Sequence, residues 1–262
     1  KISENYNTIK SIYLVIRLTL FALSKKIDMY RWIMMNKLTL VIPAKNESES
    51  LPKVLKELEY LKINTIVVIP NEDNLTKQSI QKFNCKIIEE KNGKGYGNAL
   101  RTGINEVKTD YFCIFNADGS FNPIYLERMY EVLDKNNADF IFCSRYEMNA
   151  GSDDDTFLTY VGNKIFTFLC NFFFKLKITD VLFTYVMGKS KEYKSLNLKS
   201  DDFSFCIELP IKAKFKSFKL LSLASHERSR IAGIKKVNEF KDGFLILISI
   251  LRILVFRKWK KK

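Results

Sequence analysis

The sequence predicts an α/β fold in which a mostly parallel sheet is flanked by helices. Short apolar runs rich in β-branched residues alternate with segments in which apolar residues recur at helical spacing. Such alternation indicates right-handed crossover units, in which successive strands lie parallel. The predicted strands are residues 38–42, 65–69, 85–88, 111–115 and 140–143, and the predicted helices are residues 51–61, 98–107 and 124–133.

Each element has its own signal along the chain. The first strand, LTLVI, is short and apolar and is closed by Pro43, which is typical of a buried strand. In the next segment, apolar residues recur three or four positions apart: Leu51, Val54, Leu55, Leu58 and Leu61. A glycine-rich turn, KNGKGYG, leads into the helix at about Asn98, and a later helix begins near Phe203.

The fourth predicted strand ends in two oxygen-bearing side chains, Asn116 and Asp118, within the stretch YFCIFNADGSFNP. In an open α/β sheet, ligands bind at the carboxyl ends of the strands. Mg²⁺ is held in proteins by one or two carboxylates together with substrate phosphates. The segment therefore suits an enzyme that handles a nucleoside diphosphate, although a solvated turn uses the same residue types.

Residues 38 to about 245 resemble the family 2 glycosyltransferases of GT-A fold. The likeness is greatest to the branch that makes polyprenyl-phosphate sugars such as dolichol-phosphate mannose. Eight segments carry it in the family's order: VIPAKNE (Val41–Glu47), NGKGYGNALRTGI (Asn92–Ile104), NADGSFNP (Asn116–Pro123), CSRY (Cys143–Tyr146), VGNK (Val161–Lys164), ITD (Ile178–Asp180), DFSFCIE (Asp202–Glu208) and HERSRIAGIKK (His226–Lys236). The resemblance implies a Rossmann-like domain that transfers a sugar from a nucleoside-diphosphate donor with inversion.

The resemblance also implies a donor site. The loop containing Pro43, Ala44, Asn46 and Glu47 would hold the nucleotide, although Asn46 and Glu47 also suit a helix cap. Asn116 and Asp118 would hold Mg²⁺ or Mn²⁺ across the diphosphate. Two cations of the glycine-rich segment would neutralise the diphosphate, namely Lys94 and Arg101.

Two arginines would contact phosphate by the same resemblance. Arg145 follows the fifth strand, and Arg228 lies on a late loop. A planar guanidinium suits bidentate recognition of phosphate. With Asp118 they form the expected catalytic set. The family often has an arginine just before Gly162 and Asn163, but tyrosine and valine stand there in this chain. That absence weakens the specific prediction of a lipid-phosphate acceptor.

Two departures from the family pattern affect the donor. Asn116 stands where an aspartate is usual, so the site loses a charge and metal affinity should fall. The second strand usually ends in aspartates that read the base, whereas this chain reads IPNED at residues 69–73, so Glu72 or Asp73 takes over or base recognition has changed. A non-catalytic sugar-nucleotide-binding relative is therefore an alternative.

The acidic residues near the last predicted helix leave a second alternative, transfer to a sugar hydroxyl of a glycan. Asp201, Asp202 or Glu208 could then remove the proton of the hydroxyl, although capping of the helix is the simpler role for Asp202. A lipid phosphate would need no base. The run from Asp153 to Asp155 is expected to be a solvated acidic loop.

Composition indicates an enzyme at the cytoplasmic face of a membrane, bound peripherally. The net charge is +14, yet no nucleic-acid motif accompanies it, so no nucleic-acid partner is expected. The five cysteines are scattered without metal or redox spacing. Residues 244–256 are mostly apolar but would span only about 20 Å as a helix, short of the roughly 30 Å hydrocarbon core. Arg257–Lys262 would then bind an anionic surface.

The predicted organisation has three parts. Residues 1–36 are an amphipathic helix or an extension upstream of the true start, residues 37–240 are the GT-A domain, and residues 241–262 are an apolar helix with a polybasic tail. The aromatic stretch from Val161 to Phe174 either lies against lipid near the acceptor opening or packs in the core.

Overall fold

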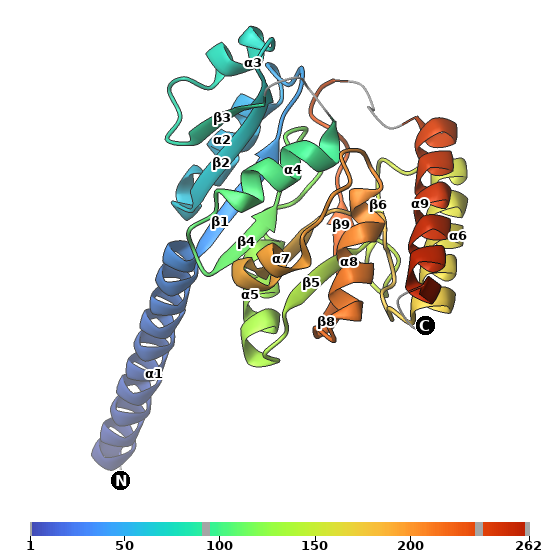
Figure 1. The fold of residues 1–262 in the computed structure, drawn as a ribbon. Helices are drawn as coiled ribbons and strands as arrows, with labels where there is room; N and C mark the ends of the chain where they lie inside the picture. Colours follow the sequence, from blue (N-terminus) through green and yellow to red (C-terminus); the bar gives the residue numbers. More distant parts are fainter. Residues whose placement is uncertain (1, 91–94, 234–237, 260–262) are drawn as a thin grey trace.

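The computed structural model describes residues 2–90, 95–233 and 238–259, and within them a seven-stranded sheet forms the centre of the molecule. The strand order is β3-β2-β1-β4-β7-β5-β8, and helices cover both faces (Figure 1). β7 runs antiparallel to β4 and β5, whereas the other neighbouring pairs are parallel. The α/β fold with a mostly parallel sheet is thus confirmed. The strands of this sheet are β1 (Leu38–Pro43), β2 (Asn64–Pro70), β3 (Lys86–Glu90), β4 (Tyr111–Ile114), β5 (Phe140–Ser144), β7 (Val186–Lys189) and β8 (Leu220–Ala224).

Alternation along the strands divides the core into two layers. On β1, Leu40 and Ile42 belong to one buried cluster and Val41 to the other. The first cluster includes the apolar faces of α2 and α5, and the second those of α4, α7 and α8. These helices and the short elements near them are α2 (Leu51–Leu58), η1 (Glu59–Leu61), α3 (Asn74–Ser79), α4 (Tyr96–Asn105), α5 (Tyr125–Lys135), α7 (Ser190–Leu196) and α8 (Phe205–Phe215).

β7 and β8 are strands that the sequence patterns do not predict. β7 is inserted between β4 and β5 and is only four residues long. It contains Gly188, where a Cβ atom would lie 2.4 Å from Cδ1 of Phe140 on the neighbouring strand. A side chain there would have to displace an aromatic ring of the core, so the close approach requires glycine. A separate two-stranded sheet pairs β6 (Gly151–Ser152) with β9 (His226–Glu227) in parallel.

The N-terminal residues form one long helix, α1 (Ile2–Lys37), which projects from the domain (Figure 1). Its C-terminal end is attached to the domain by polar contacts. Arg31 Nε donates to Glu127 Oε1 of α5 at 2.6 Å, and Lys37 Nζ lies 3.7 Å from Asp110 Oδ2. Residues 13–23 are exposed along their whole length and mostly apolar.

Two helices form one edge of the molecule, α6 (Phe157–Phe174) and α9 (Glu239–Trp259), and they stand side by side in Figure 1. α9 packs on the domain through Ile246 and Ile250, which are buried, and Ser249 Oγ lies 2.9 Å from Ser204 Oγ. α6 likewise buries Cys170 and Phe174. The predicted C-terminal helix is therefore attached to the domain through its middle turns, and residues 260–262 of the predicted polybasic tail lie outside the described residues.

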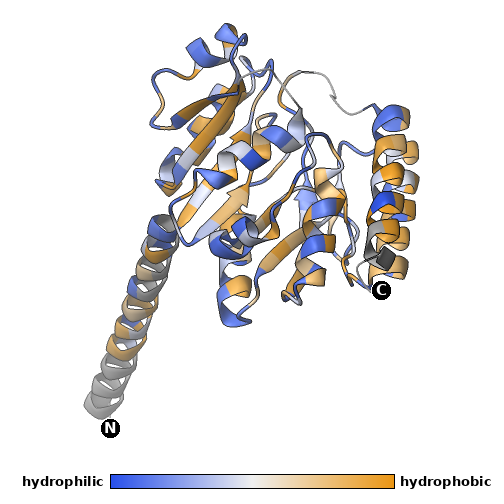
Figure 2. Ribbon diagram, viewed as in Figure 1, coloured by the Kyte–Doolittle hydropathy of each residue, from blue (hydrophilic) through white to orange (hydrophobic). Residues whose placement is uncertain are grey.

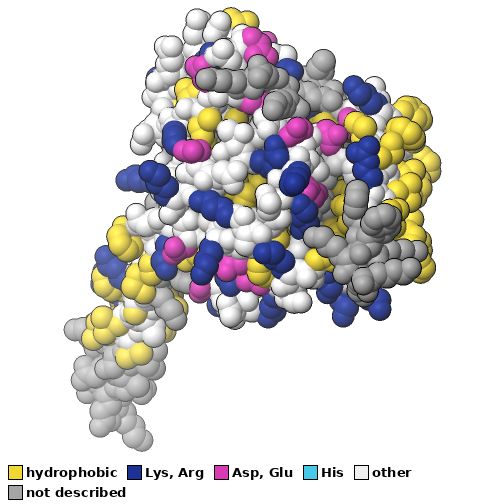
Figure 3. All heavy atoms as spheres, viewed as in Figure 1, with side chains coloured by type: hydrophobic (Ala, Val, Ile, Leu, Met, Phe, Trp, Pro, Cys, Tyr) yellow, Lys and Arg dark blue, Asp and Glu magenta, His cyan; other side chains and the backbone are white. Residues whose placement is uncertain are grey.

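The outward sides of α6 and α9 remain apolar and exposed. Figure 2 shows hydrophobic residues along both helices, and Figure 3 shows their side chains gathered at this edge. The exposed large apolar residues of the two helices are Phe157, Leu158, Tyr160, Ile165, Phe168, Phe172, Phe173, Phe240, Phe244, Leu247, Leu251 and Val255; we call this set the α6–α9 face. Over the described residues, α6 is the helix whose length and hydropathy would suffice to cross a bilayer.

Candidate active site

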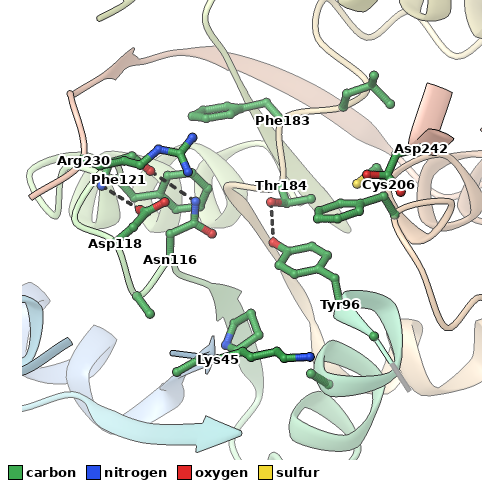
Figure 4. Close-up of a pocket in the computed structure, with 18 of the residues that line it drawn as sticks. Lys45, Tyr96, Asn116, Asp118, Phe121, Phe183, Thr184, Cys206, Arg230 and Asp242 are labelled. Atoms are coloured by element: carbon green, nitrogen blue, oxygen red, sulfur yellow. Dashed lines mark hydrogen bonds between the residues drawn. The ribbon is translucent and has the colours of Figure 1, made fainter. Parts of the chain in front are cut away.

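A pocket of about 980 Å³ lies at the carboxyl ends of the central strands. One half is built from the ends of β1, β2, β3 and β4 and from the start of α4. The other half is built from α6, α8, α9 and the loops beside β5 and β9. Figure 4 shows side chains from both halves pointing toward one another across this space.

The loop after β1 lines the first half as the sequence predicts, with Pro43, Ala44, Asn46 and Glu47 all at the wall. Its shape is fixed by polar contacts. Asn46 has a left-handed backbone, with a φ of 54°, and its N–H donates to Asp73 Oδ2 at 2.6 Å. Ser50 Oγ donates to the Glu47 carboxylate at 2.5 Å. The N-cap of α2 is Ser50, so Asn46 and Glu47 are not the cap of that helix.

The two carboxylates considered as base readers are not in the pocket wall. Asp73 caps α3 by accepting from the N–H of Thr76 at 3.2 Å, and it also holds the N–H of Asn46. Glu72 is exposed. The carboxylate that does line this end is Glu90, which is buried at the end of β3 and which sequence reasoning missed. Its position at the end of a predicted strand was the signal that could have found it.

Asn116 and Asp118 lie together at the end of β4, facing the middle of the pocket (Figure 4). Asp118 Oδ1 accepts from the N–H of Ser120 at 3.0 Å, and Asn116 Nδ2 donates to Ser120 Oγ at 3.2 Å. The turn needs Gly119, whose φ is 84° and where a Cβ would lie 2.4 Å from Cδ1 of Ile231.

These two residues fit a hard divalent cation only together with a substrate. An ionised carboxylate has about four acceptor positions, so the bond from Ser120 leaves Asp118 able to bind a cation. Among the described residues no group of three or more His, Cys, Asp or Glu side chains is arranged to hold a metal. Asn116 and Asp118 would therefore supply the protein oxygens, and a diphosphate would have to supply others.

Arg145 lies at the pocket wall, where three carboxylates surround its guanidinium. Its Nε and Nη2 donate to the two oxygens of Asp180 at 2.8 and 3.1 Å, and Nη1 lies 3.2 Å from both Asp155 and Glu227. Burial alone would lower the pKa of Arg145, but the carboxylates of Asp180 and Glu227 raise it above its ordinary value. Burial raises the pKa of Glu227, and the charge of Arg145 offsets part of this rise. A phosphate at Arg145 would have to compete with these carboxylates.

The segment after β9 presents two arginines in different directions. Arg228 is not at the pocket wall: it donates to both oxygens of Glu57 at 2.7 and 2.9 Å and to the carbonyl oxygen of Phe121 at 2.7 Å. Arg230 lines the pocket near Asp118 (Figure 4) and donates to Asp154 at 2.5 and 3.2 Å. The hydrogen bond to Asp154 raises the pKa of Arg230. Arg230 is thus a pocket cation that sequence reasoning missed.

Of the two predicted cations of the glycine-rich segment, Arg101 does not join this site. Arg101 donates to Asp201 at 2.5 Å and to the carbonyl oxygen of Leu198 at 3.2 Å, and it does not line the pocket. Lys94 lies outside the described residues. From this segment, Gly95 and Tyr96 line the pocket, and the Tyr96 hydroxyl lies 2.7 Å from Thr184 Oγ1.

The acidic loop of Asp153 to Asp155 is not simply solvated, contrary to expectation. Each aspartate contacts a different side chain: Asp153 lies 3.0 Å from His226, Asp154 pairs with Arg230, and Asp155 contacts Arg145. The loop is therefore tied to β9, to the segment after β9 and to the segment after β5, and its Asp154 and Asp155 form part of the pocket wall.

The acidic residues near α8 have separate roles. Glu208 accepts from the N–H groups of Lys199 and Ser200, and although burial opposes it, the bond from Lys212 and these N–H groups lower its pKa. Asp202 accepts from the N–H of Ser204 at 2.8 Å, at the start of α8, and also lines the pocket.

Comparison with known proteins gives a hexosyltransferase, an uncharacterized glycosyltransferase and an uncharacterized protein among the relatives. A hexosyltransferase of low-salt glycan biosynthesis, Agl6 of Haloferax volcanii, is 24% identical over 215 residues, covering 79% of this chain and 51% of that protein. An uncharacterized protein of Methanocaldococcus jannaschii is 27% identical over 112 residues, covering 39% of this chain and 49% of that protein. The chain thus spans about half the length of these two curated relatives. An uncharacterized glycosyltransferase of Mycobacterium tuberculosis is 25% identical over 210 residues, covering 80% of this chain and 94% of that protein.

The fold is shared with solved enzymes. Glucosyl-3-phosphoglycerate synthase from Mycobacterium tuberculosis, in complex with Mn²⁺, UDP and phosphoglyceric acid, superposes with a TM-score of 0.66 at 12% identity, covering 84% of this chain and 78% of that one. Mannosyl-3-phosphoglycerate synthase from Rubrobacter xylanophilus has a TM-score of 0.60 at 13% identity, covering 89% and 77%.

The sequence profile of the glycosyl transferase family 2 matches residues 39–196, which contain β2 to β5, all of β1 but its first residue, and the loop carrying Asn116 and Asp118. This match covers more than half of the chain. The chain belongs to glycosyl transferase family 2.

Proposed function

We propose that the protein transfers a hexose from a nucleoside-diphosphate sugar to a membrane-linked acceptor, polyprenyl phosphate in the first instance, with inversion at the anomeric carbon. The observation that carries the proposal is the double role of α6 and α9. Thr159 and Asn163 of α6 and Ile246 of α9 line the pocket, while the α6–α9 face of the same helices is exposed. An apolar surface of this kind marks a site of membrane or protein contact.

Support for the donor comes from Asn116, Asp118 and Arg230. Charge builds up on the diphosphate as the bond to the sugar breaks, and Arg230 lies where it can approach that charge once it leaves Asp154. Mg²⁺ or Mn²⁺, when bound with the diphosphate, would neutralise part of its charge. Solved relatives of the same fold, though only 12% identical, bind Mn²⁺ or Mg²⁺ with UDP.

The acceptor oxygen would attack the anomeric carbon from the face opposite the diphosphate. Its new bond to carbon forms as the bond from carbon to the diphosphate oxygen breaks. A phosphate monoester acceptor is already largely ionised near pH 7, so the chain need supply no base for it. The likeness to the polyprenyl-phosphate branch in the motifs from Val161 to Lys236 supports this acceptor.

A specific observation supports a second candidate, transfer to a hydroxyl of a lipid-linked glycan. Arg145 already contacts three carboxylates, and Arg228 is bound to Glu57 outside the pocket wall. Asp202, by contrast, lines the pocket and carries a carboxylate that could accept the proton of a hydroxyl. The Haloferax relative is named for glycan biosynthesis, which agrees with either acceptor.

Membrane association is part of the proposal. α6 lies along the domain and lines the pocket, so we propose that it lies on the membrane surface rather than crossing it, with the α6–α9 face among the lipid headgroups. We place the protein peripherally at the cytoplasmic leaflet, whose anionic lipids attract a chain of net charge +14.

Transfer assays with the full chain test the function. The chain is incubated with Mn²⁺ and radiolabelled UDP-hexose or GDP-hexose, using vesicles that contain polyprenyl phosphate, a lipid-linked glycan or neither. We expect label in the lipid fraction when polyprenyl phosphate is present and none with Asp118→Ala. Label only with the lipid-linked glycan would support the second candidate. Nucleotide binding without transfer to either acceptor would show the non-catalytic relative.

A further inference from the structure

The donor end of the pocket has a small apolar slot with one carboxylate beside it. Ala44, Val68, Pro70 and Ala99 line it, and all four are small or flat side chains at the ends of β1 and β2 and on α4. Ala44 N–H donates to the carbonyl oxygen of Val68 at 2.9 Å, which keeps the two strand ends together. Such a slot suits a planar, mostly apolar ring.

Glu90 stands at the edge of that slot. In the register of β2 and β3 it pairs directly with Pro70, and only 5% of its surface is exposed. Within the described part of the chain, Asn98 Nδ2 donates to its Oε1. A buried carboxylate requires hydrogen-bond donors, and one amide donor does not use the four acceptor positions of a carboxylate. Its remaining capacity therefore favours a ligand that brings an N–H group.

The distance along the sheet agrees with a nucleoside bound between Glu90 and Asp118. β3 and β4 are separated by β2 and β1 in the strand order, which makes three strand spacings. Three spacings amount to about 14 Å. A base at Glu90 thus leaves room for ribose and for a diphosphate that reaches Asn116 and Asp118.

We infer that Glu90 selects the nucleobase of the donor by accepting a hydrogen bond from a ring N–H group, as uracil and guanine offer. This inference rests on the proposed function. Cytosine and adenine present a ring nitrogen lone pair at the corresponding position, which a carboxylate repels. Glu90 would therefore replace the carboxylates expected at the end of β2, where Asp73 is committed to α3 and to Asn46.

The test is calorimetric binding of UDP, GDP, CDP and ADP to the full chain with Mn²⁺. We expect UDP or GDP to bind at least about tenfold more tightly than CDP and ADP, because the free energy of one hydrogen bond to a charged group corresponds to at least about a tenfold difference in affinity. The comparison of UDP with GDP then identifies the base. Preference for CDP or ADP would overturn the inference.

Glu90→Gln is the diagnostic variant, because its carbonyl oxygen can still accept from Asn98 while its amide can donate to a ring nitrogen. In Glu90→Gln, the preference for UDP or GDP over CDP and ADP should fall at least about tenfold, and Glu90→Ala should lose this preference as well. Glu47→Gln removes the same charge from the loop after β1, so any change in affinity should be the same for all four nucleotides. Circular dichroism checks the fold of each variant.

An unchanged ratio of UDP to CDP affinity in folded Glu90→Gln and Glu90→Ala would overturn the role of Glu90 and leave the proposed function standing. Failure of the wild-type chain to bind any of the four nucleotides would overturn both.

Discussion

Replacing Arg145 with methionine should destabilise the protein strongly at neutral pH. The substitution leaves two buried carboxylates, Asp180 and Glu227, and the partly buried Asp155 without the guanidinium that lies within 3.2 Å of each. Breaking a buried ion pair by removing one partner costs about 3–5 kcal/mol. A carboxylate left without Arg145 can take up a proton and so lose its buried charge. Protonating an ordinary carboxylate at pH 7 costs about 4 kcal/mol, which sets an upper limit on the loss of stability. We therefore expect a loss of about 4 kcal/mol in the free energy of unfolding.

The loss of stability in Arg145→Met should be smaller at low pH than at neutral pH. Burial already raises the pKa of Glu227 above 4.5, and removing Arg145 raises it further. A group whose folded pKa is raised favours the folded state at low pH, and this contribution is lost as pH rises through the folded pKa. At pH 5, where protonating an ordinary carboxyl costs only about 1.5 kcal/mol, the loss should shrink to that size.

Urea denaturation at pH 5 and pH 7 measures both quantities. The matched control is Arg128→Met on α5, because Arg128 pairs with Glu131 on the exposed surface and its loss should cost about 0–0.5 kcal/mol. A loss below about 1 kcal/mol for Arg145→Met at pH 7, or one that does not change with pH, would refute the reasoning. Arg145 would then be a cation available for phosphate instead of a support for the pocket wall.

Three further predictions concern the pocket and the surface. Asp118→Ala should abolish transfer and the Mn²⁺ dependence of UDP affinity while leaving the thermal transition unchanged, and normal transfer would sink the metal assignment. Arg230→Ala should weaken UDP binding about tenfold with little change in stability, whereas Arg228→Ala should cost about 1–3 kcal/mol of stability with little change in UDP binding. If Arg228→Ala weakened UDP binding and Arg230→Ala lowered stability instead, Arg228 would be the pocket cation and Arg230 the structural one. Phe172→Ser on the α6–α9 face should reduce sedimentation with anionic vesicles, whereas Leu75→Ser, at an equally exposed site on α3, should not. Equal effects of the two substitutions would argue against the α6–α9 face as the membrane-binding surface.

The half of the pocket built from the ends of β1 to β4 and the start of α4 is the part that local patterns predict well. The runs that form β1, β2, β4 and β5 are mostly apolar and bounded by turn residues, so these strands and the polar residues at their ends can be located from neighbouring letters. β3 reads KIIEE and is apolar only at Ile87 and Ile88. Asn116 and Asp118 were found in this way, and they lie at the pocket. β7 was missed because a four-residue strand containing Gly188 has no period that distinguishes it from a loop.

The half of the pocket built from α6, α8, α9 and the loops beside β5 and β9 depends on contacts between distant parts of the chain, which no local pattern contains. The carboxylates around Arg145 lie 10, 35 and 82 residues away in sequence. Arg228 and Arg230 are two residues apart, yet one is bound to Glu57 and the other lines the pocket, because the chain has left β9 and follows no strand alternation there. Family motifs locate this segment but do not decide which arginine faces the ligand.

The two-sided character of α6 and α9 has a thermodynamic consequence. Their inner residues, such as Asn163 and Ile246, touch whatever fills the pocket, and their outer residues, such as Phe168, touch whatever covers the α6–α9 face. The two surfaces are separated by about one helix diameter, about 10 Å. If occupancy of the pocket changes affinity at the outer face by some factor, the outer contact must change affinity in the pocket by the same factor. Vesicle binding with and without nucleotide, and nucleotide binding with and without vesicles, must therefore yield one coupling constant.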